Sequence, residues 1–245
     1  CSDLAVQKAV RTIHGSGYEN LRLDIDTINA ICWCFMRPVG KPSYTHELMG
    51  DISQLQAAIT RGFAELPPAA AAPFSWFVMA SDVPGIYNLG GDLGHFAERI
   101  RTRDLDAMRH YGHVAVTAIH RNAVAFDSPV VTMALVQGDA LGGGFEHALS
   151  FDLIVAERSA KMGLPEILFN MFPGMGAYSF LSRRMDRAKA EALILSGRVS
   201  IKMAPVVRRL QARRGFEPLL CVTGQPPAPE TRLAASRRPQ EPGDD

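Results

Sequence analysis

The chain has 245 residues, of which 47% are hydrophobic and 21% charged, and its formal net charge is +1 at pH 7. This length allows one α/β domain or two small ones, and the near-neutral charge gives no electrostatic reason to expect a nucleic acid or an anionic membrane as partner. No apolar run approaches the roughly 20 residues needed to span a bilayer. The first residues, CSDLAVQKAVRTIHG, contain no cleavable apolar segment, so we expect a cytoplasmic protein.

The four cysteines are too few for a disulfide framework in a chain of this size. Cys32 and Cys34 lie two apart in the apolar run ICWCFM, so they share one face of a strand and are expected to be small buried hydrophobic residues. A metal site would need further ligands at suitable spacing, and the sequence offers none. We therefore predict that the protein holds no metal.

The first half of the chain alternates strand and helix patterns. Residues 18–37 predict two strands joined by a turn, and residues 45–66 carry apolar side chains at helical spacing. Residues 74–81, FSWFVMAS, predict a buried strand. A glycine-containing loop, PGIYNLGGD, follows, and a helix is expected to begin at Asp92, whose side chain can cap it.

The second half continues the alternation. Residues 104–126 predict an amphipathic helix, and residues 129–136, PVVTMALV, a strand whose lack of alternation is typical of coverage on both faces. QGDALGGG then leads into a helix over residues 145–150, which is followed by a short buried strand at 151–157 and helical patterning around 176–195. Strand, loop and helix in repeated order predict an α/β fold of parallel βαβ units.

The composition changes near the end of the chain. From Gly197 onward Arg and Pro dominate, and hydrophobic periodicity disappears after about Leu220. Such composition predicts poor order. We therefore expect a core domain over residues 1–196 and an atypical Arg/Pro-rich tail over residues 197–245.

Two glycine loops follow predicted strands and open predicted helices. In one, the run Gly142 to Gly144 precedes Glu146; in the other, Asn88-Leu89-Gly90-Gly91 precedes Asp92. Glycines let the backbone approach a ligand closely, and amides at a helix N-terminus can hold a developing oxyanion. One such run alone favours a plain strand-to-helix turn. Two loops at the carboxyl ends of strands can place two N–H donors on one oxygen.

Glu146 and Glu166 are the candidate acid and base. Both have apolar neighbours, which would raise their pKa values by desolvation. Two carboxyls that share a pocket have separated pKa values, so that one can donate a proton while the other accepts one. From spacing alone, a solvated Glu146 and a Glu166 that only caps the next turn remain the simpler alternative.

Other chemistries find little support. The sequence contains neither GxGxxG nor GxxxxGK, which disfavours a nucleotide phosphate site in either glycine loop. GxSxG is also absent, which disfavours a Ser-His-Asp hydrolase. His110 and His113 are three apart on a predicted helix, but histidines so placed are more often ordinary surface or core residues than ligands.

The segments ALVQGDALGGGFEHALSFDLIVAE and MGLPEILFNMFPGMGAYSFLSRR together resemble the central region of the enoyl-CoA hydratase/isomerase (crotonase) superfamily. NLGGDLGHF resembles the first oxyanion loop of that family. Within it, YNLGGDL, ALGGGFE and GLPEILF followed by FPGMGAYSF are most similar to the diffusible signal factor synthase branch, which makes cis-2-unsaturated fatty-acid signals. The resemblance runs from about Tyr18 to Gly197.

The resemblance implies a crotonase-like spiral of ββα units with parallel sheets. It implies that the amides of Gly91 and Gly143 form an oxyanion hole for a thioester carbonyl, and that Glu146 and Glu166 are the catalytic acid and base. The family normally continues beyond this region with helices that close the acyl pocket and build trimers or hexamers. The residues after Gly197 do not align with those helices, so the C-terminal helical region is expected to be altered or truncated.

The resemblance also implies a substrate. Gly90, Leu141 and Met175 match positions near the acyl chain in the signal-synthase branch. That branch acts on 3-hydroxyacyl thioesters of acyl carrier protein, dehydrates them and hydrolyses the thioester, and this chemistry requires no cofactor. We expect the same dehydratase and thioesterase activity on an acyl carrier protein or CoA thioester.

Two alternatives remain open. One is an ordinary enoyl-CoA hydratase, which adds water reversibly and releases no free acid. The other is a crotonase-fold protein that has lost catalysis and binds a partner, for example a sensor kinase, as the altered tail suggests. The presence of both glutamates and both glycine loops argues against the second alternative.

Overall fold

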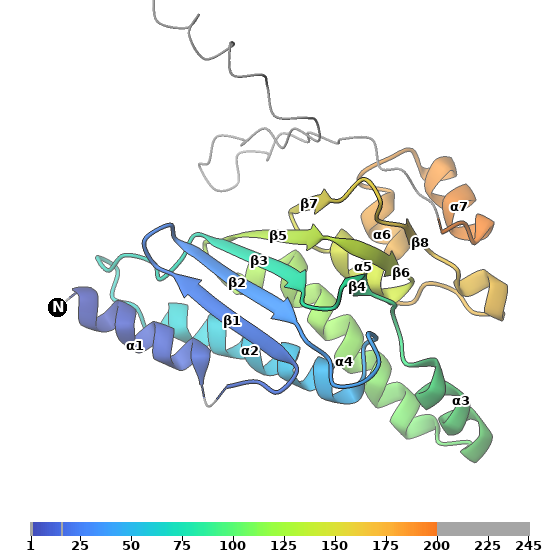
Figure 1. The fold of residues 1–245 in the computed structure, drawn as a ribbon, viewed down its shortest axis with the longest axis horizontal. Coiled ribbons are helices and arrows are strands. Elements are labelled where there is room, and N and C mark those ends of the chain that lie inside the picture. Colours follow the sequence, from blue (N-terminus) through green and yellow to red (C-terminus); the bar gives the residue numbers. More distant parts are fainter. Residues whose placement is uncertain (1, 16, 200–245) are drawn as a thin grey trace, which may run out of the picture.

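The computed structural model describes residues 2–15 and 17–199 (Figure 1). In chain order its helices and strands are α1 (Ser2–His14), β1 (Leu21–Asp26), β2 (Ile31–Met36), α2 (His46–Ala64), β3 (Trp76–Ser81), β4 (Gly85–Asn88), α3 (Leu93–Thr102), α4 (Leu105–Ala123), η1 (Ala125–Asp127), β5 (Val131–Val136), β6 (Gly138–Leu141), α5 (Gly143–Leu149), β7 (Leu153–Ala156), β8 (Met162–Gly163), η2 (Glu166–Phe169), α6 (Ala177–Leu181) and α7 (Arg187–Ser196).

The strands form two sheets. The larger has the order β1-β2-β3-β5-β7, and only the β1–β2 pair is antiparallel. The smaller has the order β4-β6-β8 and is parallel throughout. The predicted hairpin over 18–37 and the predicted parallel βαβ units are thus confirmed.

The small sheet was not predicted. Sequence patterns assign PGIYNLGGD and QGDALGGG to loops, but the structure pairs β4 with β6, with Gly85 opposite Gly138 and Asn88 opposite Ala140. Each of these strands is only four residues long and begins with glycine, so it carries too few side chains for a periodic signal. Their pairing brings the two glycine loops to the same edge.

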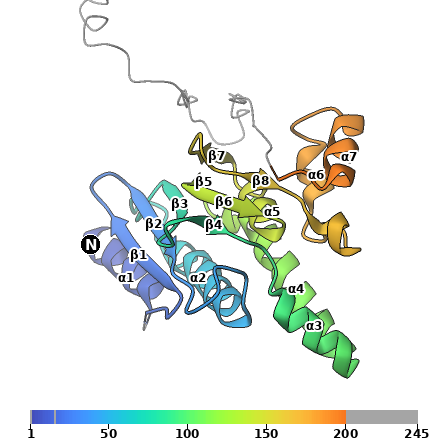
Figure 2. The ribbon, with the colours of Figure 1, turned by 45° about the vertical axis from the view of Figure 1, so that its right-hand side comes forward.

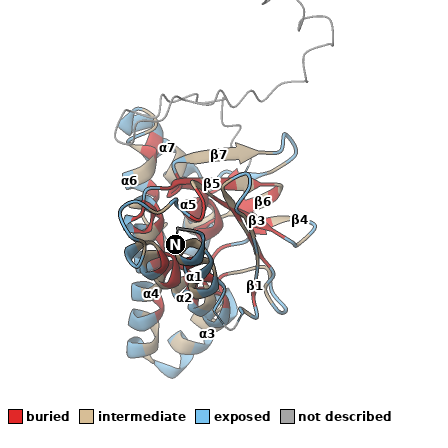
Figure 3. Cartoon of the chain, turned by 90° about the vertical axis from the view of Figure 1, so that its left-hand side faces the viewer, coloured by how far each residue is buried: buried red, intermediate tan, exposed pale blue. Residues whose placement is uncertain are grey.

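The core lies between the large sheet and a layer of helices, and Figure 3 shows the buried residues gathered there. Cys32 and Cys34 point into this core and are fully buried free thiols, as predicted. Helix α1, which the sequence patterns did not predict, packs beside α2 (Figure 2), where the side chain of Ile13 lies against Gly62. Thr45 and Asp92 cap α2 and α3 through their side chains.

Several predicted elements need correction. The strand at 151–157 is the edge strand β7, and its residues are only partly buried. On β5, Met133 and Leu135 are likewise only partly buried, although both faces were expected to be covered. The pattern at 176–195 is two helices, α6 and α7. The tail prediction lies almost wholly outside the described residues. No helix in the described part of the chain is long and apolar enough to cross a membrane.

Candidate active site

The second glycine loop makes a sharp turn between β6 and α5. Gly142 has a φ of +54°, a left-handed conformation that favours glycine, and its N–H donates to the carbonyl of Gly163 on β8 at 2.8 Å. Gly143 is the first residue of α5, so its N–H has no partner within the helix. The turn therefore exposes the Gly143 amide at the helix N-terminus.

The first glycine loop lies directly against this turn. Gly90 has a φ of +88°, and its N–H donates to the Asn88 side chain at 2.8 Å. A β-carbon placed on Gly90 would stand 2.9 Å from the Gly143 nitrogen, and one placed on Gly143 would stand 3.6 Å from the Gly91 nitrogen. The amides of Gly91 and Gly143 are thus close neighbours. Within the described residues, neither N–H donates to another protein group.

Glu146 lies on the first turn of α5 and is 1% exposed, so the solvated alternative is wrong for this residue. Its Oε1 accepts hydrogen bonds from the backbone N–H of Met175 at 2.8 Å and of Ala177 at 3.0 Å. Burial raises the pKa of Glu146 from 4.5 to about 7, the negative charge of Glu166 adds to this, and the backbone amides of residues 175–177 oppose it. A carboxyl of this kind can both give and take a proton near neutral pH.

Glu166 opens η2, the short helix that follows β8, and is partly buried. A β-carbon on Gly142 would stand 2.8 Å from its Oε1, which places the carboxyl against the same turn that carries Gly143. Its Oε2 is buried and has no hydrogen-bond partner among the described residues. Burial raises the pKa of this carboxyl as well. Glu166 therefore lies against the glycine turn, and its charge acts on Glu146, which follows the same turn on α5.

The other predicted residues also border the turn. The carbonyl of Leu141 and the amide of Gly143 are the two groups nearest to Gly90, and the Sδ of Met175 would stand 2.8 Å from a β-carbon on Gly143. The backbone amides of Met175 and Ala177, which hold Glu146, were missed by sequence reasoning. The Gly174-Met175-Gly176 triplet was the one local sign that backbone donors might be exposed there.

His147 lies next to Glu146 in sequence but takes no part in this arrangement. It is fully buried among aromatic rings, with Tyr44 and Phe151 at centroid distances of 5.3 and 5.0 Å. Burial lowers its pKa to about 3, so the imidazole is neutral. Among residues 2–15 and 17–199, no cluster of three or more His, Cys, Asp or Glu side chains is arranged to hold a metal ion.

The sequence model of the enoyl-CoA hydratase/isomerase family matches residues 74–203, more than half of the chain. The chain belongs to this family. The matched region contains both glycine loops and both glutamates of the site.

Curated relatives of this enoyl-CoA hydratase/isomerase family member include a Mycobacterium leprae protein named "Probable enoyl-CoA hydratase echA8". It is 31% identical over 189 residues, which are 76% of this chain and 62% of the relative. The rat protein named "Methylglutaconyl-CoA hydratase, mitochondrial" is 41% identical over 125 residues, which are 50% of this chain and 36% of the relative. The chain thus spans between about a third and two thirds of the length of these relatives.

Solved structures show the same fold. An enoyl-CoA hydratase from Bacillus anthracis superimposes with a TM-score of 0.62 at 23% identity, covering 74% of this chain and 64% of its own. Pseudomonas aeruginosa DspI superimposes with a TM-score of 0.60 at 22% identity, covering 74% of this chain and 66% of its own. The predicted crotonase-like α/β fold with mostly parallel sheets is therefore confirmed.

Proposed function

We propose that the chain catalyses reversible dehydration of a 3-hydroxyacyl thioester to a 2-enoyl thioester, with Glu146 and Glu166 as the acid and base. The observation that carries this proposal is the partly buried Glu166 carboxyl against the Gly142 turn, where its charge acts on the buried Glu146. Two amides with no acceptor among the described protein groups lie beside this turn. Relatives named as hydratases of CoA thioesters support the same chemistry.

In the proposed reaction the thioester carbonyl oxygen accepts hydrogen bonds from the N–H groups of Gly91 and Gly143. This interaction makes the α-proton more acidic, because it stabilises the enolate oxygen that forms when the proton leaves. One glutamate takes that proton. The other donates its proton to the 3-hydroxyl, so that the C–O bond breaks, water leaves and the double bond forms between the α and β carbons.

The pKa values of the pair suit this exchange. Dehydration needs one carboxylate and one carboxylic acid at the same time, and hydration needs the reverse assignment. Burial raises both pKa values, and the charge of Glu166 raises that of Glu146 further, which favours a pair that shares one proton near neutral pH. Gly90, Leu141 and Met175, which border the turn, are proposed to contact the acyl part of the substrate.

We propose as a second step that the same site hydrolyses the thioester and releases a free 2-enoic acid. A water held by the glutamates would add to the polarised carbonyl and give one proton to a glutamate carboxylate. The tetrahedral oxyanion would then collapse to the acid as the C–S bond breaks, and the leaving thiolate would take up that proton from the glutamate. The Oε2 of Glu166, which has no hydrogen-bond partner in the part of the chain that the structure describes, favours this step, because a buried carboxylate oxygen can orient such a water. The substrate would be a thioester of CoA or acyl carrier protein.

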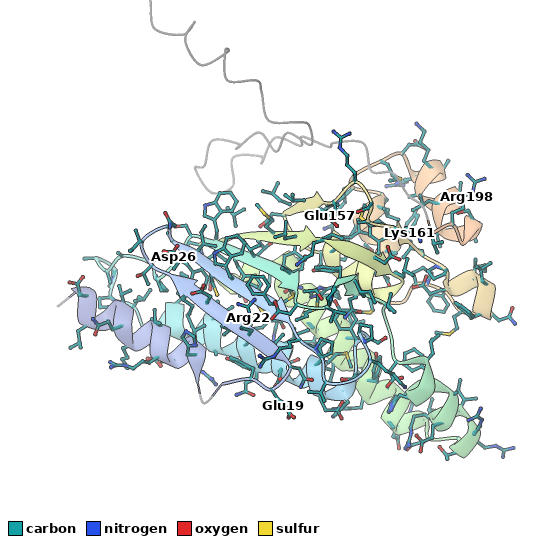
Figure 4. The ribbon with its side chains drawn as sticks, viewed as in Figure 1. Glu19, Arg22, Asp26, Glu157, Lys161 and Arg198 are labelled. Carbon is teal, nitrogen blue, oxygen red and sulfur yellow. The ribbon has the colours of Figure 1, made fainter. Side chains whose placement is uncertain are left out.

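The test uses the full chain with 3-hydroxyacyl thioesters of CoA and of acyl carrier protein. Mass spectrometry follows the 2-enoyl thioester and the free acid, and a thiol reagent follows thioester hydrolysis. Glu166→Gln and Glu146→Gln should each lower kcat by about 10² to 10⁴, which is the usual contribution of one acid or base. Glu19→Gln is the matched control, since Glu19 is exposed and lies beside the start of β1 (Figure 4).

The products separate the two steps. Loss of water without release of thiol supports the dehydratase and contradicts the thioesterase. Full activity in both glutamate variants would contradict the assignment of the site. If the wild-type chain turns over no thioester of either carrier, the proposed function is wrong.

A further inference from the structure

The Tyr111 side chain reaches the first glycine loop from α4, which is distant in sequence. We infer that its hydroxyl is a positioning group that fixes the direction of the Gly91 N–H. The inference rests on the proposed role of that amide as an oxyanion donor, and it assigns to Tyr111 a part in the reaction without contact with the substrate.

The peptide between Gly90 and Gly91 is held at its carbonyl end. The carbonyl of Gly90 accepts a hydrogen bond from the N–H of Tyr44 at 2.7 Å, and Tyr44 pairs with Gly91 as an isolated parallel bridge. A trans peptide is planar, with its C=O and N–H on opposite sides. Anchoring the Gly90 carbonyl to Tyr44 therefore turns the Gly91 N–H away from Tyr44.

The hydroxyl of Tyr111 joins the backbone of Tyr44 to the backbone of Asp92. It donates to the carbonyl of Tyr44 at 2.6 Å and accepts from the N–H of Asp92 at 3.3 Å. The peptide groups on both sides of Gly91 are thus tied, one through the Tyr44 backbone and one directly. This single oxygen closes a ring of hydrogen bonds around the residue whose amide is proposed to bind the carbonyl.

Packing fixes the aromatic ring of Tyr111 independently of its hydroxyl. Tyr111 is 6% exposed, stacks on His95 at a centroid distance of 5.5 Å, and meets the edge of Phe96 at 4.9 Å. Phe96 in turn lies against Gly91, where a β-carbon would stand 2.8 Å from its Cζ. Burial raises the pKa of Tyr111 to about 12, so the phenol keeps its proton and can donate.

Removing only the phenol oxygen of Tyr111 should therefore make the loop around Gly91 more mobile without leaving a cavity in the core. In Tyr111→Phe the carbonyl of Tyr44 and the N–H of Asp92 lose a shared partner, and only the Tyr44 N–H still holds the Gly90–Gly91 peptide in its orientation. A misdirected donor weakens transition-state binding more than substrate binding, because the negative charge on the carbonyl oxygen is largest in the transition state.

The experiment compares Tyr111→Phe with Tyr87→Phe in the full chain. Tyr87 is 1% exposed on β4, and its hydroxyl lies 3.4 Å from His147 Nδ1, so its loss removes another buried phenol oxygen outside the ring of hydrogen bonds. For Tyr111→Phe we expect kcat to fall by about 10- to 100-fold with KM within about twofold. The carbonyl stretch of a bound 2-enoyl-CoA in infrared difference spectra should move to higher frequency. Tyr87→Phe should keep the wild-type values.

A second measurement needs no turnover and separates this inference from the proposed function. Amide hydrogen exchange of residues 90–92 should accelerate in Tyr111→Phe and stay at the wild-type rate in Tyr87→Phe. If the wild-type chain is inactive but amide exchange accelerates only in Tyr111→Phe, the proposed function is wrong and the role of Tyr111 in positioning the loop is supported. Unchanged exchange and carbonyl stretch in Tyr111→Phe, or equal losses in both variants, would overturn the inference.

Discussion

Replacing Glu146 by glutamine should change the free energy of unfolding in a way that depends on pH. Relative to the wild type at the same pH, the variant should be more stable at pH 8 than at pH 5. Glu146 is buried, and its Oε1 accepts from the amides of Met175 and Ala177. A glutamine Oε1 can accept the same two hydrogen bonds. The substitution therefore removes the ionisation and keeps the main contacts.

The direction in which stability changes with pH follows from the direction of the Glu146 pKa shift. Burial raises the pKa of Glu146 from 4.5 to about 7 in the folded state. Between these values the folded chain holds a proton that the unfolded chain has lost, so stability falls as pH rises through this window. The contribution of the neutral carboxyl is fully present below pH 4.5 and is lost once pH exceeds about 7. At about 1.4 kcal/mol per pH unit, the total loss is about 3 kcal/mol.

Urea unfolding followed by circular dichroism at pH 5 and pH 8 measures this effect. The free energy of unfolding of Glu146→Gln minus that of the wild type should rise by about 2 to 3 kcal/mol from pH 5 to pH 8, because a small part of the total is already lost at pH 5. Groups that do not interact with Glu146 contribute equally in both proteins and cancel in this difference. Glu19→Gln, at an exposed position, should give a difference that does not change with pH. An equally flat result for Glu146→Gln would refute the argument that burial raises this pKa.

Two further substitutions test the packing that positions the site. Gly144→Ala places a β-carbon against the carbonyl of Asn88 and should lower the free energy of urea unfolding by about 1 to 3 kcal/mol. In the control Gly112→Ala, on α4, the β-carbon meets nothing within 4 Å, and the substitution should raise the free energy of unfolding by about 1 kcal/mol. A matching loss of stability at both glycines would be evidence against a specific clash at Gly144. Thr45→Ala removes the acceptor of the Leu48 N–H at the start of α2 and should lower the free energy of unfolding by about 1 kcal/mol in the same assay. Thr45→Ser keeps a hydroxyl and should keep most of that stability. Equal losses in both variants would show that the hydroxyl cap is not the cause.

The large sheet and the long helices could be predicted because they satisfy local rules. The apolar spacing over residues 45–66 matches α2, and its start at Thr45 follows from a side chain that accepts a backbone N–H. β3 is a short apolar run bounded by turns. Helix α1 has an amphipathic pattern too, although no helix is predicted there from the sequence. The small sheet could not be predicted, because β4, β6 and β8 are too short to show a period.

The site also contains features that could be predicted from the sequence and features that could not. The glycine runs and the glutamates were found because each lies at a strand-to-helix junction or in a recognisable motif. What brings them together is the pairing of β4 with β6, which sets Gly90 against Gly143 across about fifty residues of sequence. The raised pKa of Glu146 depends on that pairing as well, since apolar neighbours in sequence do not bury a carboxyl until the fold closes around it.

The hydrogen bonds around Gly91 mark the limit of reasoning from sequence. Tyr111 and Tyr44 are 67 positions apart and belong to no motif, and one phenol oxygen is shared between a carbonyl and an amide of different segments. Such a contact depends on where α4 crosses the loop, which follows from tertiary packing. If the orientation of the Gly91 amide limits the rate, the substitutions with the largest effect on kcat will include a residue on α4 that never touches the substrate. Ordinary rates in Tyr111→Phe would instead mean that the two glycine turns orient the amide by themselves.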